Sequence, residues 1–290
     1  MEIRQLQYFQ MACQLKSITK AAERLHVSQP SVSMAIQKLE EELGVLLLDR
    51  RQKQITLTGE GEVFLQRIRD VLSRLQDIAV EMNDYKRLQK GTIRIGIPPM
   101  IGTFLFPHIY AEFGKRYPLV EIVATEAGTM TIREQLEQDV LDLGIILLSQ
   151  LSPNLETAPL AENQILVCLP PGHPLAELEH IPFTALAREP FILFHEDSYN
   201  RHIILEECRR HRFQPHIRFS SNQIGTITGL VEQGMGISFL LDAVVSRYAN
   251  ICSRPLANPL FFKIVMAWKS NRYLSKPAKA FMDFITELYR

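Results

Sequence analysis

The chain has 290 residues, of which 46% are hydrophobic, and its 32 Lys and Arg residues are balanced by 32 Asp and Glu residues. A chain of this length buries at least one full core and divides into two or three units. The zero net charge does not point to nucleic acid, a membrane or a charged substrate, so any such assignment depends on local motifs. Even the first 58 residues carry only eight basic against six acidic side chains.

The four cysteines lie far apart, and none belongs to a C-x-x-C pair or has histidines at zinc-finger spacing. They are interpreted as reduced, mostly buried thiols, and neither a metal site nor a cofactor is expected. The first 20 residues lack a continuous apolar run, and no later segment approaches the roughly 18 apolar residues of a membrane span. These features predict a soluble, cytoplasmic protein that does not enter a membrane.

Three short helical patterns fill the first 43 residues. Ser17 is a suitable N-cap for the second helix and Ser28 for the third, where Pro30 lies in the first turn. Gly44 fits the left-handed position that ends the third helix. The apolar stripe of this helix consists of Val32, Ile36, Leu39 and Leu43.

The opposite face of the third helix is polar and suits contact with a DNA groove. Gln side chains bond adenine edges, Ser and Lys bond phosphates, and a helix N-terminus favours a phosphate. A short helix, a tight turn and a helix with such a face form a helix-turn-helix, whereas the alternative is a three-helix bundle with a polar outer face. The residues predicted to contact DNA are Gln29, Pro30, Ser31, Ser33, Met34, Gln37 and Lys38.

A basic turn at residues 50–53 is followed by alternating polar and apolar residues up to 57, which predicts a small hairpin wing. Beside the third helix, Arg51 and Lys53 are expected to enter the minor groove or to meet the DNA backbone. For either residue singly, a solvated basic loop is an equally good interpretation.

A long helix is predicted from Thr58, a suitable N-cap, to about residue 89. It has no Pro, and its two Gly residues lie in the first turn. Its heptad seam is about 45 Å long at about 1.5 Å per residue. A seam of this length favours pairing with a second chain, whereas the alternative is a helix packed on its own domain. The seam positions are Phe64, Ile68, Val71, Leu75, Ile78, Met82 and Tyr85.

From Gly91 onward strands alternate with helices, which predicts a parallel sheet with crossover helices. The apparent return of the chain after a second such unit indicates two lobes, between which the chain crosses twice. Strands are expected at residues 93–97, 120–125, 143–147, 164–169, 191–194, 216–220, 236–240 and 262–268. Helices are expected at residues 103–116, 131–138, 200–211, 224–233 and 278–289.

One set of N-terminal residues stands in register with a known signature: Ser17, Ala21, Ala22, Leu25, Ser28, Gln29, Pro30, Val32, Ser33, Ile36, Leu39, Glu40, Leu43, Gly44, Leu47, Arg50, Leu57, Thr58 and Gly61. In these positions the chain closely resembles LysR-type transcriptional regulators. Two positions depart from the pattern. Leu48 stands where Phe is usual, and Met34 stands where a polar base-reading residue is common. For Met34, apolar contact with a thymine methyl remains open.

Looser matches extend over the rest of the chain: Gly91, Arg94, Ile95, Gly96, Phe106, Pro107, Tyr117, Pro118, Gly128, Leu141, Asp142, Leu143, Leu169, Pro170, His173, Pro174, Leu175, Val231, Gly234 and Gly236. They resemble the family's effector domain, which has the fold of periplasmic solute-binding proteins. The resemblance implies a winged helix-turn-helix DNA-binding domain at 1–58, a dimerising linker helix at 59–90 and a two-lobed α/β effector-binding domain at 91–290. Lobe I is expected to comprise 91–162 and 267–290, and lobe II 163–266.

Open α/β sheets bind ligands at the C-terminal ends of their strands and beside helix N-termini. In this chain these are the turns after Ile97, Thr125, Phe194 and Ser220. The candidate effector-binding residues in or near these turns are Pro99, Met100, Thr103, Thr129, Ser198, Arg201 and Asn222.

Each candidate has a structural alternative. Thr103 and Thr129 are equally well interpreted as N-caps, and Arg201 is better interpreted as a surface cation on a helix. Where family members often carry a Ser or Thr that bonds an anionic effector, this chain has Met100, which cannot donate that bond. The expected ligand is a small polar or anionic metabolite held by backbone N–H groups, Thr103 and Thr129.

No enzyme motif is evident, since G-x-S-x-G, H-E-x-x-H, a Walker loop and G-x-G-x-x-G after a strand are all lacking, so no catalytic residue is expected. The resemblance implies a regulator that binds promoter or operator double-stranded DNA and whose binding or bending of the promoter changes with a small-molecule effector. It implies a homodimer through residues 59–90 and a homotetramer, with contact to RNA polymerase left open. The alternative is a cytoplasmic solute-binding protein of the same fold without a transcriptional role. The effector, the operator and the sign of regulation do not follow from the sequence.

Overall fold

The computed structural model describes residues 1–49, 55–86, 91–148 and 152–289. The chain divides into two compact units, Met1–Lys86 and Arg87–Arg290. Over the described ranges, no helix is long and apolar enough to cross a membrane. The predicted end of the linker, at residue 90, lies outside the described residues.

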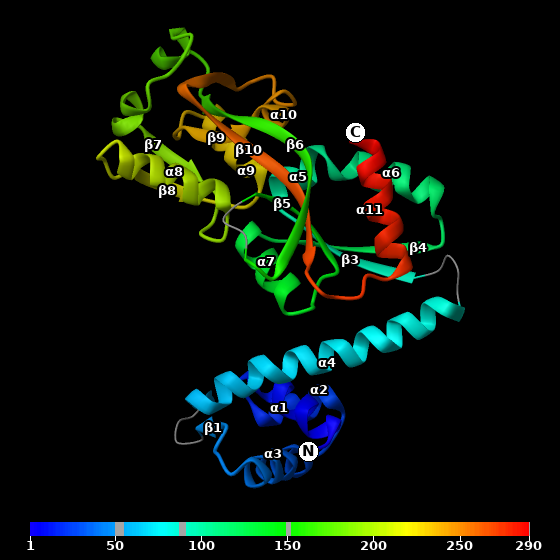
Figure 1. Ribbon diagram of the computed structural model, residues 1–290. Coiled ribbons are helices and arrows are strands. Elements are labelled where there is room, and N and C mark those ends of the chain that lie inside the picture. Colours follow the sequence, from blue (N-terminus) through cyan, green and yellow to red (C-terminus); the bar gives the residue numbers. More distant parts are fainter. Residues whose placement is uncertain (50–54, 87–90, 149–151, 290) are drawn as a thin grey trace. The chain divides into compact units, whose positions relative to one another are not determined.

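Three short helices form the core of the N-terminal unit: α1 (Ile3–Leu15), α2 (Ile18–Leu25) and α3 (Gln29–Leu43). They bury Phe9 and Ala21 together with the α3 stripe, and the small alanine side chains of α2 let its neighbours approach closely. Figure 1 shows the three helices gathered against one half of the longer helix α4 (Gly59–Lys86).

Side-chain caps begin the second and third helices, as the sequence predicts. Ser17 Oγ accepts a hydrogen bond from Lys20 N at 3.3 Å, and Ser28 Oγ accepts one from Ser31 N at 3.3 Å. Gly44 ends α3 with a φ of 70°, in the left-handed region that glycine adopts without strain. The caps fix where α3 begins and ends, and therefore which of its side chains face outward.

The predicted stripe of α3 is wrong at its last position. Val32, Ile36 and Leu39 are fully buried, but Leu43 is 38% exposed. The buried position in this turn belongs instead to Glu40, which is 6% exposed. Its Oε1 atom accepts hydrogen bonds from Leu47 N at 2.8 Å and from the next residue's N at 3.1 Å. The carboxylate is buried because it satisfies backbone donors of the segment that follows α3.

A short hairpin follows, formed by β1 (Leu48–Asp49) and β2 (Thr56–Leu57) in antiparallel pairing. It lies where the sequence predicts the wing. The turn between the strands, with Arg51 and Lys53, lies outside the described residues. Thr58 Oγ1 then accepts a hydrogen bond from Gly61 N at 2.9 Å and so caps α4.

Helix α4 divides into two parts that differ in burial. Phe64 lies with its ring 5.6 Å from that of Phe9, and Ile68 is buried in the same core, so the first part packs on its own unit. The predicted seam is therefore not free over its whole length. Its later apolar members are exposed: Val71 by 49%, Leu75 by 38%, Ile78 by 55% and Met82 by 50%. The side chain of Tyr85 lies outside the described residues.

The C-terminal unit is built on a six-stranded sheet of order β4-β3-β5-β10-β6-β9 (Figure 1). Its strands are β3 (Gly91–Ile97), β4 (Val120–Glu126), β5 (Leu143–Leu147), β6 (Leu155–Leu169), β9 (Ser238–Leu241) and β10 (Cys252–Lys269). Strand β3 is parallel to β4 and β5, but β10 is antiparallel to β5 and β6, and β9 is antiparallel to β6. The predicted parallel sheet is therefore wrong for three of the five strand pairings.

The reason is the length of two strands that the sequence suggests only in part. Strand β6 has 15 residues and β10 has 18, and they pair along almost their whole length. Figure 1 shows them running side by side from one lobe into the other. The chain thus crosses twice between the lobes, as expected, and it does so within one antiparallel strand pair.

Helices cover the sheet in both lobes. Lobe I contains α5 (Pro99–Phe104), α6 (Phe106–Arg116), α7 (Thr129–Glu137) and α11 (Lys276–Leu288). Lobe II contains 3-10 helices at Pro174–Glu177 and Phe183–Arg188, a parallel pair of strands, β7 (Pro190–Leu193) and β8 (His216–Ser220), and the helices α8 (Tyr199–Arg210), α9 (Ile224–Glu232) and α10 (Asp242–Val245). One apolar core runs through both lobes and includes Phe113, Phe191, Phe239 and Phe281.

The predicted helix at 103–116 is two helices that meet at Leu105. Pro107 has no N–H to donate to the carbonyl of Thr103, four residues earlier, so a continuous helix would leave that oxygen unpaired. In the structure Arg247 Nη1 donates to Thr103 O at 3.0 Å. The break also moves the first helix earlier, to Pro99, so Thr103 lies within α5 and does not cap it.

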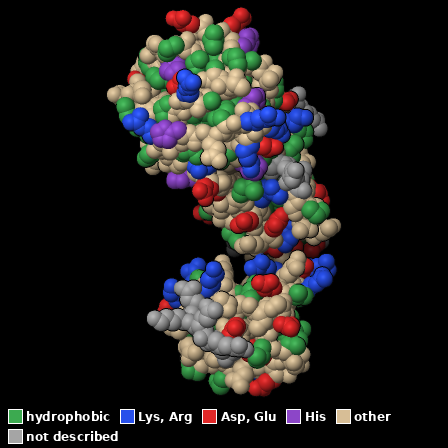
Figure 2. Space-filling view, turned by 90° about the vertical axis from the view of Figure 1, so that its left-hand side faces the viewer, with side chains coloured by type: hydrophobic (Ala, Val, Ile, Leu, Met, Phe, Trp, Pro, Cys, Tyr) green, Lys and Arg blue, Asp and Glu red, His purple; other side chains and the backbone are tan. Residues whose placement is uncertain are grey.

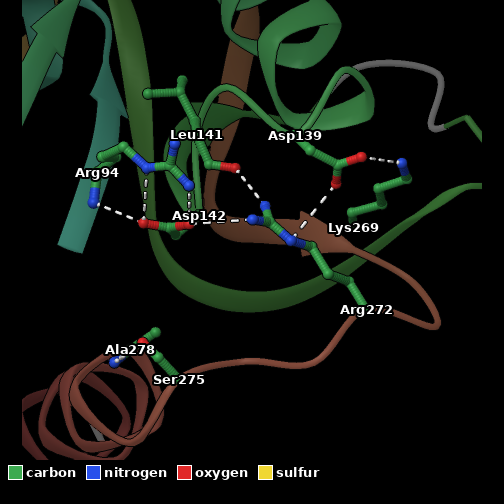
Figure 3. Close-up of polar contacts among 8 residues, drawn as sticks. All are labelled: Arg94, Asp139, Leu141, Asp142, Lys269, Arg272, Ser275 and Ala278. Carbon is green, nitrogen blue, oxygen red and sulfur yellow. Dashed lines mark hydrogen bonds and ion pairs between the residues drawn. The ribbon is translucent and has the colours of Figure 1, made fainter. Parts of the chain in front are cut away.

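An ion-pair network fastens β3 and β5 of lobe I to the segment before α11 (Figure 3). Arg94 Nη2 and Nε donate to Asp142 at 2.8 and 3.2 Å, and the Arg94 backbone N donates to the same carboxylate at 2.8 Å. Arg272 Nη1 donates to the carbonyl of Leu141 at 3.0 Å, and its Nη2 lies 3.4 Å from Asp142 Oδ1. Asp139 pairs with Lys269 at 2.7 Å. Asp142 is therefore the carboxylate that joins the two arginines.

Candidate DNA-contacting surface and effector cleft

The outward face of α3 leaves the residues predicted to contact DNA accessible. Ser33 and Ser31 are half-buried, and the Ser31 hydroxyl lies 2.7 Å from Ser28 Oγ, so it takes part in the cap. Met34 is 63% exposed, so its side chain is accessible for an apolar contact. The exposed members of the set are Gln29, Pro30, Met34, Gln37 and Lys38. This arrangement supplies amides, an ammonium group and one apolar contact on a single helix face.

A second polar surface, which the sequence reasoning missed, lies at the start of α2. A hollow there is lined by Leu15, Lys16, Ser17, Ile18, Thr19, Lys20 and Ile55. Lysines beside a helix N-terminus suit a DNA phosphate. Lys16 and Lys20 flank the Ser17 cap in the sequence, and that spacing is the signal that could have found them.

Charge on the surface is mixed. Figure 2 shows Lys and Arg side chains interspersed with Asp and Glu over the visible face, without one continuous basic field.

The exposed part of α4 borders a hollow against α1. This hollow is lined by Ile3, Gln7, Gln10, Leu72, Leu75 and Gln76. Together with Val71, Ile78 and Met82, it forms an apolar strip edged by amide side chains, which we call the α4 strip. Such a strip on a single chain is typical of a helix that pairs with another.

A cleft lies between the lobes of the C-terminal unit, where several strands end. Its lining residues are Pro98, Pro99, Met100, Gly128, Thr129, Leu147, Phe194, Ser198 and Asn222. They follow or end β3, β4, β5, β7 and β8, which is the edge at which parallel sheets bind ligands. The space open to the centre of a water molecule is about 10 Å³, about the room that one water molecule needs. The cleft of this structure is therefore closed.

Five of the seven predicted effector residues meet in this cleft: Pro99, Met100, Thr129, Ser198 and Asn222. The structure does not bring Thr103 and Arg201 to it. Thr103 Oγ1 donates to Pro99 O at 2.9 Å within α5. Arg201 Nη1 donates to Phe194 O at 3.0 Å and to Ser220 Oγ at 2.8 Å, so this cation holds two loop ends together.

Thr129 is the first residue of α7, after the N-cap Gly128, and is 1% exposed. It is therefore not the N-cap that the alternative interpretation expects. Among the described residues nothing accepts a hydrogen bond from its hydroxyl or from its backbone N–H. These two donors at a helix N-terminus suit a polar group of a ligand.

Met100 fills space and also satisfies a backbone donor. Its side chain is buried, and Leu241 N donates to its Sδ atom at 3.4 Å. A thioether is a weak acceptor, so this contact is looser than one to oxygen. Met100 thereby joins α5 to the end of β9.

A residue that the sequence reasoning missed, Asp197, joins the two lobes beside the cleft. Its Oδ2 atom accepts hydrogen bonds from Gly128 N at 2.8 Å and from Thr131 Oγ1 at 3.4 Å. Its backbone oxygen accepts one from Met130 N at 3.3 Å. We call these three bonds the α7 clasp. No periodic pattern links residues 69 positions apart, so the sequence holds no signal for it.

Three of the four thiols are poorly suited to redox chemistry. Burial raises the pKa of Cys13, Cys168 and Cys208 to about 12, so these side chains are neutral thiols at neutral pH. Thiol oxidation proceeds through the thiolate. In the described part of the chain no group of three His, Cys, Asp or Glu residues is placed to hold a metal ion.

A winged helix-turn-helix joined in one chain to a two-lobed α/β unit with a cleft defines a class of DNA-binding protein that carries its own small-molecule domain. Residues 3–62 match the family of bacterial regulatory helix-turn-helix proteins of the lysR type, and residues 86–290 match the LysR substrate binding domain. The chain belongs to the LysR family of transcriptional regulators.

Similar proteins extend over the whole chain. YwbI of Bacillus subtilis, an uncharacterised HTH-type transcriptional regulator, is 32% identical over 98% of this chain and 95% of its own length. The structure of a full-length OxyR variant from Pseudomonas aeruginosa is 28% identical, with a TM-score of 0.73 over 98% of this chain and 94% of that one. HinK of the same organism is 28% identical, with a TM-score of 0.61 over 99% of this chain and 98% of its own. These relatives are transcriptional regulators, and nothing among them supports a solute-binding protein without a transcriptional role.

Proposed function

We propose that this regulator reads its promoter through the outward face of α3, pairs with a second copy through the α4 strip, and responds to a small molecule in the cleft. One observation supports the proposal that α3 contacts DNA. The helix buries Val32, Ile36 and Leu39, and its opposite face stays accessible. A capped helix with one free polar face suits a major groove.

The N-terminal unit also provides the surface proposed for dimerisation, the α4 strip. Two copies joined along α4 present two α3 helices, which suits an operator with two half-sites. The amide side chains of Gln7, Gln10 and Gln76 at the edge of the α4 strip suit a polar rim around an apolar centre. A further pairing of dimers gives the tetramer expected for the family, in which effector binding changes how far apart the DNA-binding pairs lie.

The proposal that an effector binds in the cleft depends on hydrogen-bond donors there that have no acceptor among the described residues. The hydroxyl and backbone N–H of Thr129 suit a polar group, and Pro99, Met100 and Phe194 suit an apolar body. A ligand that fits one arrangement of the lobes better than another shifts the population toward it. That shift changes the spacing of the subunits and the bending of the promoter. The cleft requires no cofactor for this role.

The DNA-contacting face makes a direct prediction. Gln29→Ala and Ser33→Ala are each expected to weaken binding to the specific operator by about 1–3 kcal/mol, because each removes a polar contact to a base or phosphate. Operator sites located by genome-wide binding supply the DNA, and affinity is measured by fluorescence anisotropy at fixed salt.

The matched control is Gln14→Ala, an exposed glutamine on α1, which is expected to bind like the parent. Operator affinity unchanged in both α3 variants, with folding intact by circular dichroism, would remove this helix from the recognition role.

The cleft makes a second prediction. For an effector identified by its effect on the promoter footprint, Thr129→Val is expected to weaken binding about tenfold, since the nearly isosteric side chain loses the hydroxyl donor. Calorimetry with the parent and the variant measures the difference. Thr103→Val, whose hydroxyl bonds Pro99 O within α5, is the control and is expected to bind the effector like the parent. Equal affinity of Thr129→Val and the parent would place the effector elsewhere.

A further inference from the structure

The N-terminus of α7 already holds a carboxylate from within the chain. In the α7 clasp, Asp197 offers its Oδ2 atom to Gly128 N at 2.8 Å and to Thr131 Oγ1 at 3.4 Å. A backbone N–H and a hydroxyl around one oxygen, at the positive end of a helix dipole, are contacts of the kind that a bound anion makes. Asp197 thus fills the position that an anionic ligand of α7 would take.

The two lobes lie very close together where Gly128 meets Asp197. A Cβ atom added to Gly128 would lie 2.3 Å from Asp197 O and 2.4 Å from its Cγ, so only glycine allows the contact. Asp197 precedes α8 of lobe II, whereas Gly128 precedes α7 of lobe I. The clasp therefore exists only while the lobes are together.

The cleft offers an anion no other charged partner. Its lining consists of six residues with apolar or no side chains (Pro98, Pro99, Met100, Gly128, Leu147, Phe194) and three neutral polar ones (Thr129, Ser198, Asn222), with no Lys, Arg or His. Arg201, the cation nearest in the sequence, is engaged with Phe194 O and Ser220 Oγ. Among the described residues that line the cleft, no cation would compensate a carboxylate ligand placed beside the Asp197 carboxylate, which is unfavourable for both.

We propose that Asp197 is the built-in occupant of the anion position at the N-terminus of α7, that it holds the lobes together there, and that it reserves the cleft for an uncharged effector. This inference rests on the proposed function of the cleft and narrows it. An uncharged ligand leaves the clasp in place and uses the Thr129 donors. A carboxylate must first displace Asp197.

The test measures the clasp itself, without DNA or effector. In the full-length protein, Asp197→Ala is expected to raise the amide hydrogen-exchange rate of Gly128 at least about tenfold, the factor for loss of a hydrogen bond to a charged group. Exchange in β3 is expected to stay unchanged. Glu196→Ala, which removes the exposed neighbouring carboxylate, is the control and is expected to exchange like the parent.

Acetate then tests the anion position. At constant ionic strength, acetate is expected to restore slow exchange in Asp197→Ala, acetamide is expected not to, and neither is expected to act on the parent protein. Unchanged exchange in Asp197→Ala would overturn the clasp. Two results would overturn the anion position and the selection for uncharged effectors. In the first, amide exchange in Asp197→Ala is faster and acetate does not slow it. In the second, acetate slows amide exchange in the parent protein as much as in the variant. None of these results changes the outcome of the operator-affinity and calorimetric experiments that test the proposed function. The proposal for Asp197 and the proposed function can therefore fail separately.

Discussion

Replacing both Leu75 and Ile78 by Asp is expected to turn the protein into a monomer. Both side chains belong to the α4 strip and are exposed on the single chain, so the change does not disturb the unit's own core. In a paired helix the same positions are buried, and two carboxylates there are strongly unfavourable. Operator affinity is expected to fall by roughly 10²–10⁴-fold, because each half-site is then bound alone.

Sedimentation equilibrium gives the mass and fluorescence anisotropy the affinity. The control changes Gln66 and Ser73 to Asp, positions that face away from the α4 strip at about 100° per residue. This control is expected to keep the parent's mass. If the Leu75 and Ile78 double variant also keeps that mass, the strip packs within its own subunit and the proposed dimer is wrong.

The second large effect is expected from Asp142→Ala, which should destabilise the C-terminal unit by about 3–5 kcal/mol. The carboxylate joins Arg94 to Arg272, whose side chains are 37% and 8% exposed, and it also accepts a bond from the Arg94 backbone. Removing it leaves two cations and a backbone donor without this partner. Trp268, the only tryptophan of the chain, lies in β10 and reports unfolding of this unit by its fluorescence in urea.

Two variants make the experiment specific. Asp142→Asn keeps an acceptor but loses the charge, and it is expected to cost less than Asp142→Ala. Asp283→Ala, an exposed carboxylate on α11, is expected to change stability by no more than about 0.5 kcal/mol. A loss in Asp142→Ala no larger than in Asp283→Ala would show that the network of Figure 3 contributes little.

The features that sequence predicts well are those that neighbouring residues decide. Ser17, Ser28 and Gly44 cap their helices where expected, because a cap depends on a few adjacent backbone groups. The burial of Glu40 in place of Leu43 was not predictable from neighbouring residues. Glu40 is buried only because the chain returns over it and presents two backbone N–H groups.

Long-range pairing explains the parts of β6 and β10 that the sequence did not predict. β6 contains Pro159, and β10 contains Pro255 and Pro259, residues that normally end a strand. The pairing is irregular between Pro255 and Leu260, which accommodates the missing N–H groups. Pattern alone treats these stretches as turns, because the partner strand that stabilises them is distant in the sequence, from Leu169 paired with Cys252 to Leu155 paired with Lys269.

The candidate cleft was predictable in outline and not in detail. Strand ends brought Pro99, Met100, Thr129, Ser198 and Asn222 together, as the rule for open sheets implies. Thr103 and Arg201 were predicted to lie in the cleft but do not, because each makes contacts that only the three-dimensional structure reveals. Pro107 breaks the expected helix and shifts Thr103 inward, and Arg201 finds two acceptors on neighbouring loops.

The long strand pair has a mechanical consequence for signalling. Because β6 and β10 pass through both lobes, one lobe cannot slide along the other without breaking the register of their hydrogen bonds. Twisting and bending of the pair preserve that register, and the irregular pairing at Ile264 and Val265 is a point at which bending is easiest. The motion that remains open to the unit is rotation about this shared axis. A ligand that contacts both lobes can therefore change the angle between them.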